Sequence, residues 1–432
     1  MRVASERSSN LGCSVLTAAG TMTMPRLPGR SSITRGAGVL AATTLSMVAL
    51  GLGTGPAAEA TATPSAWPAA GYGTGWSGWN SQEVTMTPAR VKAAALNYSI
   101  PTAVDPNPDG DCLNPIGPLS SAGKMYDVGP DGITAYNQWS GAKLWNVPTP
   151  GFLGTTALMQ IAGPDLVVFL VDCHSNSNAH SQVFVLNLVT GASDQLSWYD
   201  SSSVSSMVAV SGVIITSEYN DGTNWITAHG RAGNPLWRTA AGWGARVQLV
   251  ATTTLASFTD ATGVVTALRV ADGSVAWTSG VVGDPLALSQ DRTELFVTTG
   301  ASLLSLNPAT GAEHLVSFAG RGGYSAAVDA TTVYSACAGT ALCATRRSDG
   351  HSLWTIEAGS TAFAPPIVLA AGVVYFNGRS YLATTGKRIR SAADGSAVTS
   401  VSGGRIYSVI VSPVTASCDW LAAILRKVAA SV

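Results

Sequence analysis

Apolar and polar residues alternate along most of the chain in short runs that are typical of half-buried β-strands. Runs such as ITAYNQW at 133–139 and VTALRVA at 265–271 lead into a turn with a glycine, and a Trp stands four residues after that glycine. Between these runs lie hairpin-like pairs of apolar segments, for example at 207–219 and 365–378. The pattern predicts an all-β chain of short antiparallel strands.

The pattern of strand, turn glycine and Trp returns along the chain and therefore defines an internal repeat. Its turn glycines are Gly141, Gly191, Gly233, Gly273, Gly311, Gly350 and, in a weaker copy, Gly395, at spacings of 50, 42, 40, 38, 39 and 45 residues. Its tryptophans are Trp145, Trp198, Trp237, Trp277 and Trp354, and Leu315 stands in the Trp position of one copy. A period of about 40 residues is that of one four-stranded propeller blade.

The repeats predict how the ring closes. Eight hairpin-like pairs are present but only seven Trp turns, so one outer strand is missing, and the segment 94–101 could supply it. Closure by strands from both ends of the chain would leave no exposed sheet edge at the seam. We therefore predict a β-propeller of four-stranded antiparallel blades with eight blades, and a ring of seven stays open if the last hairpin is an extension. The recurring Trp is expected to pack between neighbouring blades.

The repeat resembles that of the pyrroloquinoline-quinone-like (quinoprotein-type) β-propeller superfamily, and residues 77–101 resemble the entry segment of those proteins. The resemblance implies two alternatives. Dehydrogenases of the superfamily hold a quinone with two adjacent cysteines, a calcium or related ion, a stacking Trp and an Asp base. Other members keep the propeller and lose the cofactor, and an outer-membrane assembly lipoprotein of this kind is an eight-bladed scaffold for protein partners.

This chain lacks an adjacent cysteine pair. The roughly 370 residues after Ala60 leave little beyond a bare eight-blade ring of about 320 residues. We therefore predict no catalytic or cofactor-binding residues, and a secreted, monomeric binding or scaffolding module for protein or glycan partners at the cell envelope. A quinoprotein-type dehydrogenase acting on alcohols or sugars is the alternative.

Composition agrees with a folded β-rich chain. Hydrophobic residues make up 46% of the sequence and charged residues only 11%, while 46 Gly and 21 Pro suit many tight turns. The formal net charge is −1, so the sequence gives no electrostatic footprint for nucleic acid.

Residues 1–60 have the features of an N-terminal extension and secretory signal peptide. Arginines precede an uncharged apolar run at 36–53, and Ala58, Glu59 and Ala60 match the small-x-small rule for cleavage after Ala60. An uncleaved membrane anchor is the alternative, since the apolar run is nearly long enough to span a bilayer.

The rest of the chain divides into three parts. Residues 61–89 are expected to form an entry segment or linker that lies outside the blades, and residues 90–418 the propeller. Residues 419–432 are predicted to form a helical tail, because Leu421, Ile424, Leu425 and Val428 lie on one face of a helix.

Two cysteines flank a turn of small residues between strand-like runs. Export favours disulfides, so Cys337 and Cys343 are predicted to be bonded across a hairpin. The pairing among Cys112, Cys173 and Cys418 stays open.

Two local clusters could bind a metal. Asp105, Asn107, Asp109 and Asp111 alternate as in the first half of a calcium loop, but Ile116 stands where the bidentate Glu belongs. A polar, Pro-rich linker explains the same residues and is favoured. His174 and His180 are six residues apart, a spacing that fits no common zinc site, and an extended hairpin loop is the favoured interpretation.

Overall fold

The protein is described by a computed structural model over residues 65–101, 117–129, 131–149, 156–171, 181–196, 203–220, 222–243, 248–300, 302–318, 325–337, 341–358, 366–391, 397–411 and 425–431. The chain divides into two compact units, Met1–Ala60 and Thr61–Val432, and every described residue belongs to the second. Within that unit the described secondary structure is nearly all β, with one helix, α1 (Pro88–Ala93).

The strands form eight sheets in the described residues. The first sheet contains β3 (Leu119–Ser121), β4 (Lys124–Gly129), β5 (Gly132–Asn137) and β6 (Lys143–Val147). The second contains β7 (Thr156–Ala162), β8 (Asp165–Val171), β9 (Ser181–Asn187) and β10 (Ser193–Leu196). The third contains β11 (Ser203–Val210), β12 (Val213–Asn220), β13 (Thr223–Gly230) and β14 (Pro235–Gly242). The fourth contains β15 (Val250–Ala251), β16 (Leu255–Thr259), β17 (Val264–Arg269) and β18 (Val275–Val282).

The next two sheets continue the series. The fifth contains β19 (Asp284–Leu288), β20 (Leu295–Thr298), β21 (Leu303–Leu306) and β22 (Glu313–Phe318), and the sixth β23 (Ala326–Val328), β24 (Thr332–Cys337), β25 (Ala341–Arg346) and β26 (Ser352–Glu357). The seventh contains β27 (Val368–Ala370), β28 (Val373–Phe376), β29 (Arg379–Leu382) and β30 (Arg388–Ser391), with β1 (Trp79–Asn80) added in parallel to β27. The last contains β31 (Ala397–Ser402), β32 (Arg405–Val411), β33 (Leu425–Ser431) and β2 (Ala95–Pro101).

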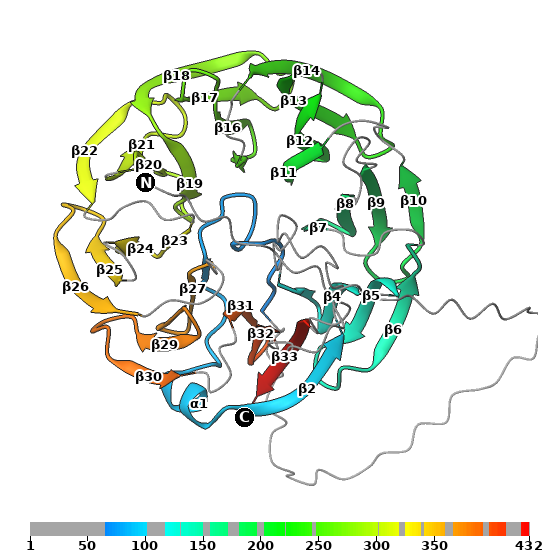
Figure 1. Ribbon diagram of the computed structural model, residues 1–432, viewed down its shortest axis with the longest axis vertical. Coiled ribbons are helices and arrows are strands. Elements are labelled where there is room, and N and C mark those ends of the chain that lie inside the picture. The colour runs from blue at the N-terminus through cyan, green and yellow to red at the C-terminus, as the bar shows by residue number, and fades with distance from the viewer. Residues whose placement is uncertain are drawn as a thin grey trace, which may run out of the picture. The chain divides into compact units, whose positions relative to one another are not determined.

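The sheets stand side by side around a common axis, as Figure 1 shows. The first strand of each sheet lies innermost, and these inner strands contact one another in chain order from β3 through β7, β11, β15, β19, β23 and β27 to β31. Within each sheet of consecutive strands the pairing is antiparallel, from the inside outward. The fold is therefore a β-propeller of four-stranded antiparallel sheets, as the sequence predicts.

The ring closes through strands from both ends of the described chain. In the last sheet β2 pairs with β33, and β33 pairs with β32. The N-terminal strand expected at 94–101 is therefore present. The helix expected over 419–432 is wrong for residues 425–431, which form a strand. Pairing on both edges stabilises the backbone of β33 through hydrogen bonds to two strands. A short isolated helix would be less stable, because such helices are marginal in water.

The recurring tryptophans pack between neighbouring sheets. A Cβ placed on Gly311 would lie 2.5 Å from the ring of Trp277, which belongs to the preceding sheet, and the Trp277 indole N–H donates to the carbonyl oxygen of Pro308 at 3.0 Å. The same relationship joins Trp145 to Gly191, Trp237 to Gly273 and Trp354 to Gly386. At the seam Tyr98 of β2 takes the Trp position against Gly141. Each Trp thus fixes one sheet against the turn of the next.

Most turn glycines share one geometry, and Gly233 departs from it because its N–H donates to Gly230, three residues earlier. Gly141, Gly191, Gly273, Gly311 and Gly350 have positive φ, and each N–H donates to the carbonyl oxygen four residues earlier. Gly386 has the same φ and the same bond, to Leu382. The seventh turn therefore lies at Gly386 and not at Gly395, which is outside the described residues.

Arg390 stands four residues after Gly386, in the place that Trp fills elsewhere. Its guanidinium donates to the carbonyl oxygen of Ala94 at the end of α1, so α1 covers this position. The repeat is harder to find here because its Trp is missing.

The disulfide between Cys337 and Cys343 is present, and it joins β24 to β25 as predicted. Trp198 and Cys112, Cys173 and Cys418 lie outside the described residues.

Candidate functional site

A segment of the chain before the propeller strands runs inside the ring. In Figure 1 it is the blue trace that crosses the space enclosed by the sheets. Residues 65–80 form backbone hydrogen bonds with inner strands or their flanking residues in six of the sheets: Trp67 with Ser120, Pro68 with Ile161, Thr74 with Ala251, Gly75 with Leu288, Ser77 with Val328, and Gly78 with Leu369. The Asn80 side chain donates to the carbonyl oxygen of Val401 in β31 of the last sheet at 2.8 Å. We call residues 65–80 the axial segment.

The axial segment corrects the expectation that residues 61–89 lie outside the blades. Trp76 packs against the core between the fourth and fifth sheets, and Trp79 packs between the sixth and seventh. The backbone there could follow the inner strands closely because Gly71, Gly73 and Gly78 adopt positive φ.

The axial segment does not pair with the third sheet. Between Ala69, bridged to Gln160 of β7, and Thr74, bonded to Ala251 of β15, the chain turns, and the Tyr72 N–H donates to the Ala69 carbonyl oxygen at 3.0 Å. Among the described residues β11 receives no backbone hydrogen bond from this segment. A pocket of about 700 Å³ lies at this gap.

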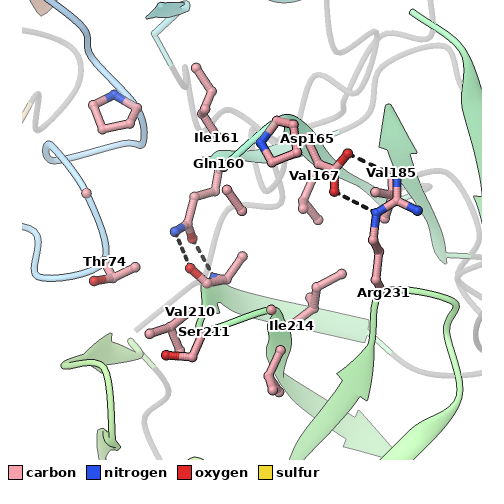
Figure 2. Close-up of a pocket in the computed structure, with 18 of the residues that line it drawn as sticks. Thr74, Gln160, Ile161, Asp165, Val167, Val185, Val210, Ser211, Ile214 and Arg231 are labelled. Carbon is pink, nitrogen blue, oxygen red and sulfur yellow. Dashed lines mark hydrogen bonds and ion pairs between the residues drawn. The ribbon is translucent and has the colours of Figure 1, made fainter. Parts of the chain in front are cut away.

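The pocket lies between the second and third sheets, at the end where β7 turns into β8 and β11 turns into β12 (Figure 2). Its floor is apolar and buried, with Val167, Val185 and Ile214. Its mouth is formed by exposed turn residues at 163–164 and 211–212. The axial segment closes one side through Pro68, Gly73 and Thr74.

Three of the described residues that line this pocket are charged, and two of them are paired. Arg231, which follows β13, donates to both carboxylate oxygens of Asp165 at 2.6 and 3.0 Å, so this ion pair joins the second and third sheets. Arg292, from the turn between β19 and β20, donates to the carbonyl oxygen of Ala251 at 3.0 Å and to Thr74 Oγ1 at 3.4 Å. Burial lowers the pKa of the Arg292 guanidinium.

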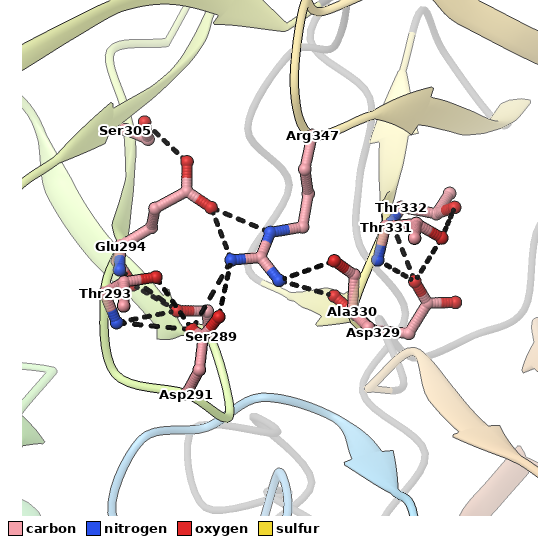
Figure 3. Close-up of polar contacts among 10 residues, drawn as sticks. All are labelled: Ser289, Asp291, Thr293, Glu294, Ser305, Asp329, Ala330, Thr331, Thr332 and Arg347. Carbon is pink, nitrogen blue, oxygen red and sulfur yellow. Dashed lines mark hydrogen bonds and ion pairs between the residues drawn. The ribbon is translucent and has the colours of Figure 1, made fainter.

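A second polar cluster joins the fifth and sixth sheets (Figure 3). Arg347, which follows β25, pairs with Glu294 at 2.6 Å and with Asp291 at 3.4 Å, and donates to the backbone oxygens of Asp329 and Ala330. Arg347 occupies the same position in its sheet as Arg231 does in the third. Because its donors are used by the protein, this cluster acts as an inter-sheet clamp rather than a binding site.

The sequence-predicted metal residues cannot be placed. Asp105, Asn107, Asp109 and Asp111, together with His174 and His180, lie outside the described residues. Within the described part of the chain, no group of three or more His, Cys, Asp or Glu side chains comes together to hold a metal ion.

The quinone site that the family resemblance implies can be tested against the residues present. The resemblance puts the quinone above the propeller axis, next to a disulfide of two adjacent cysteines, whereas the disulfide here joins Cys337 to Cys343 across a hairpin. This disulfide therefore does not fit the cysteine ring that the resemblance implies for the quinone group.

Sequence reasoning did not find Gln160, Asp165, Arg231 or Arg292. They come from separate repeats and form no local motif, and only the fold brings them together. The Gly-rich run at 71–78 was the available signal, because glycines at such density indicate close approach of the backbone to other groups.

Solved structures share this fold at low sequence identity. A quinohemoprotein alcohol dehydrogenase from Comamonas testosteroni matches 86% of this chain and 81% of its own, with a TM-score of 0.61 and 12% identity. BamB from Moraxella catarrhalis matches 78% of this chain and 98% of its own, with a TM-score of 0.57 and 18% identity. A europium-containing methanol dehydrogenase matches 85% of this chain and 98% of its own, with a TM-score of 0.57 and 10% identity.

These likenesses define the class of the protein. The chain has the β-propeller fold, which it shares with dehydrogenases and with BamB. No protein-family model and no curated protein matches the sequence. In the described residues no helix has the length and apolar character needed to span a bilayer.

Proposed function

We propose that this chain is a secreted, non-catalytic β-propeller that acts as a binding or scaffolding module for protein or glycan partners at the cell envelope. The observation that carries the proposal is that the sequence has no adjacent cysteine pair to hold a quinone above the propeller axis, while Cys337 and Cys343 are bonded across a hairpin. Secretion rests on the apolar run and the small-x-small site that ends at Ala60.

The pocket at the gap in the axial segment is the binding site that this proposal favours. The loops of a propeller are positioned by a rigid scaffold of sheets. Binding residues are found most often on loops of this kind. A volume of about 700 Å³ lies in the usual range for ligand pockets. A protein partner is favoured over a glycan at this pocket, because its floor is apolar.

Titration with pyrroloquinoline quinone and calcium tests the non-catalytic part of the proposal. The purified protein should take up no stoichiometric quinone, and it should show no dye-linked oxidation of alcohols or sugars. Stoichiometric uptake with such activity would overturn the proposal in favour of a quinoprotein-type dehydrogenase.

Site-specific photo-crosslinking in the native host tests the binding part. A crosslinking residue at Ser211, on the pocket mouth, should capture a discrete partner. The control position is Thr262, on the turn between β16 and β17, the second and third strands of the fourth sheet. Ser211 lies between the first and second strands of the third sheet, so the two positions lie at opposite ends of the sheets. Equal capture at both positions would contradict a binding site at the pocket.

A further inference from the structure

Two arginines and one aspartate are the charged residues among the described lining of the pocket between the second and third sheets. Asp165 and Arg231 neutralise one another through their two hydrogen bonds. Arg292 lines the same pocket and, within the described residues, forms no ion pair. Among the described lining residues, Arg292 is therefore a cation that faces neutral acceptors, and it suits a negatively charged group of a ligand.

Arg292 has donors to spare for such a ligand. A guanidinium carries five N–H donors, and the bonds to Ala251 and Thr74 leave others unused among the described residues. Arg292 is an exposed residue whose guanidinium is partly covered, which lowers its pKa, and a bound anion would stabilise its charged form. A carboxylate matches the planar fork of a guanidinium best.

The shape of the pocket indicates which part of a molecule enters it. The floor of Val167, Val185 and Ile214 is buried and suits an apolar side chain. The axial segment closes one side, whereas the mouth at 163–164 and 211–212 is exposed. A chain can therefore enter from solvent and end inside.

We infer that this pocket captures the C-terminal end of a protein partner, with apolar terminal side chains on the floor and the terminal carboxylate on Arg292. The inference rests on the proposed function, since it takes the partner to be a protein. Binding of a terminal carboxylate together with its side chain is a common mode of peptide recognition.

Fluorescence anisotropy with short peptides tests the inference. The probe is a fluorescein-labelled Gly-Ser-Gly-Ser-Leu-Leu with a free carboxyl terminus. It should bind at least tenfold more tightly than the same peptide with an amidated terminus. The free-acid peptide that ends in Ser-Ser should bind at least tenfold more weakly than the Leu-Leu peptide.

Variants of two arginines separate the site from general charge effects. Arg292→Gln should reduce binding of the free acid to that of the amide, and Arg292→Lys should keep part of the difference. Arg269→Gln, at an exposed arginine on β17 outside the pocket, should change neither. Circular dichroism and thermal melts should show that all three variants remain folded.

Equal binding of acid and amide, or an Arg292→Gln variant that still discriminates them, would overturn the inference. Lack of binding by every peptide would also overturn it, and the proposed function would then depend on the quinone and crosslinking results alone. Tight binding of an internal-Glu peptide with an amidated end would show that the pocket accepts an acidic side chain instead, which contradicts capture of a chain end.

Discussion

The side chain of Gln160 in β7 forms two hydrogen bonds with the backbone of Ala209 in β11. Its Nε2 donates to the Ala209 carbonyl oxygen at 2.7 Å, and its Oε1 accepts from the Ala209 N–H at 2.6 Å. The side-chain amide thus reproduces the pairing that a neighbouring strand would give. The strand that Gln160 contacts is β11, the inner strand to which, among the described residues, the axial segment forms no backbone hydrogen bond. Gln160 also lines the pocket (Figure 2).

Replacement of Gln160 should destabilise the fold. Gln160→Leu leaves both backbone groups of Ala209 without their partner, and each buried unsatisfied group costs about 1–3 kcal/mol. Urea unfolding measures the loss. The control is Gln290→Leu, because Gln290 is exposed and bonds only to Ser81 among the described residues. Equal stability of the two variants would show that Gln160 does not join the sheets.

Truncation of one inter-sheet Trp should be costly. Trp277 is 8% exposed, so Trp277→Ala should lower the free energy of unfolding by roughly 3–5 kcal/mol. Trp243 is 75% exposed, and Trp243→Ala should change it by less than about 0.5 kcal/mol. Thermal melts of the two variants provide the comparison. A neutral Trp277→Ala would mean that Trp277 does not hold the fourth and fifth sheets together.

The glycine that faces Trp277 gives an independent test. A Cβ at Gly311 would lie 2.5 Å from the Trp277 ring, whereas a Cβ at Gly300 would meet nothing within 4 Å. Both glycines have positive φ, so each Ala variant bears a conformational cost of about 1–2 kcal/mol, and only Gly311→Ala adds the clash. Gly311→Ala should therefore be the more destabilising variant in urea unfolding.

A double-mutant cycle isolates this contact. With Trp277→Ala in place, the Cβ of Gly311→Ala no longer meets a ring. The double variant should therefore lose less free energy of unfolding than the sum of the losses in the two single variants. Additive losses would show that the two residues do not interact.

Much of the fold could be predicted because its determinants recur. Each turn needs a residue with positive φ, and each joint between sheets needs a large ring, so Gly and Trp return at one spacing. The prediction went wrong where a repeat lost its ring, at Arg390, and assigned the turn to Gly395. It also went wrong at the C-terminus, where the spacing of Leu425 and Val428 suits a helix but the sheet supplies two partner strands.

The candidate site could not be predicted, for a different reason. Its residues come from the axial segment and from turns of three sheets, so no spacing along the chain relates Thr74, Asp165 and Arg292. The pocket exists because the axial segment turns away from one inner strand. Such a gap depends on the path of the backbone, which residue patterns do not encode.

Acid should weaken the clamp between the fifth and sixth sheets (Figure 3). Partial burial opposes ionisation of Asp291, but hydrogen bonds from Ser289 and Thr293 and the charge of Arg347 outweigh it and lower its pKa to about 2. A carboxyl whose pKa is lowered on folding stabilises the protein above its unfolded pKa, and this contribution is lost as pH falls through the folded value.

Asp291→Asn should therefore lower Tm at pH 6, and its difference from the wild-type protein should shrink between about pH 4 and pH 2. The control is Asp131→Asn, since Asp131 forms an exposed pair with Lys143. A difference in Tm that stays constant over this pH range would contradict the assigned pKa shift.

The axial segment offers a matched pair of glycines that tests whether it is an integral part of the fold. A Cβ at Gly78 would lie 2.7 Å from the carbonyl oxygen of Ile367 and 2.9 Å from that of Ala326, and these backbone atoms cannot move aside without displacing two inner strands. A Cβ at Gly73 would meet nothing within 4 Å. Both residues have positive φ, so the conformational cost of Ala is shared.

Gly73→Ala should lower the free energy of unfolding by about 1–2 kcal/mol, and Gly78→Ala by about 1–3 kcal/mol more, as overpacking does. Urea unfolding of the two variants measures the difference. A Gly78→Ala variant as stable as Gly73→Ala would show that the axial segment is not held against β23 and β27.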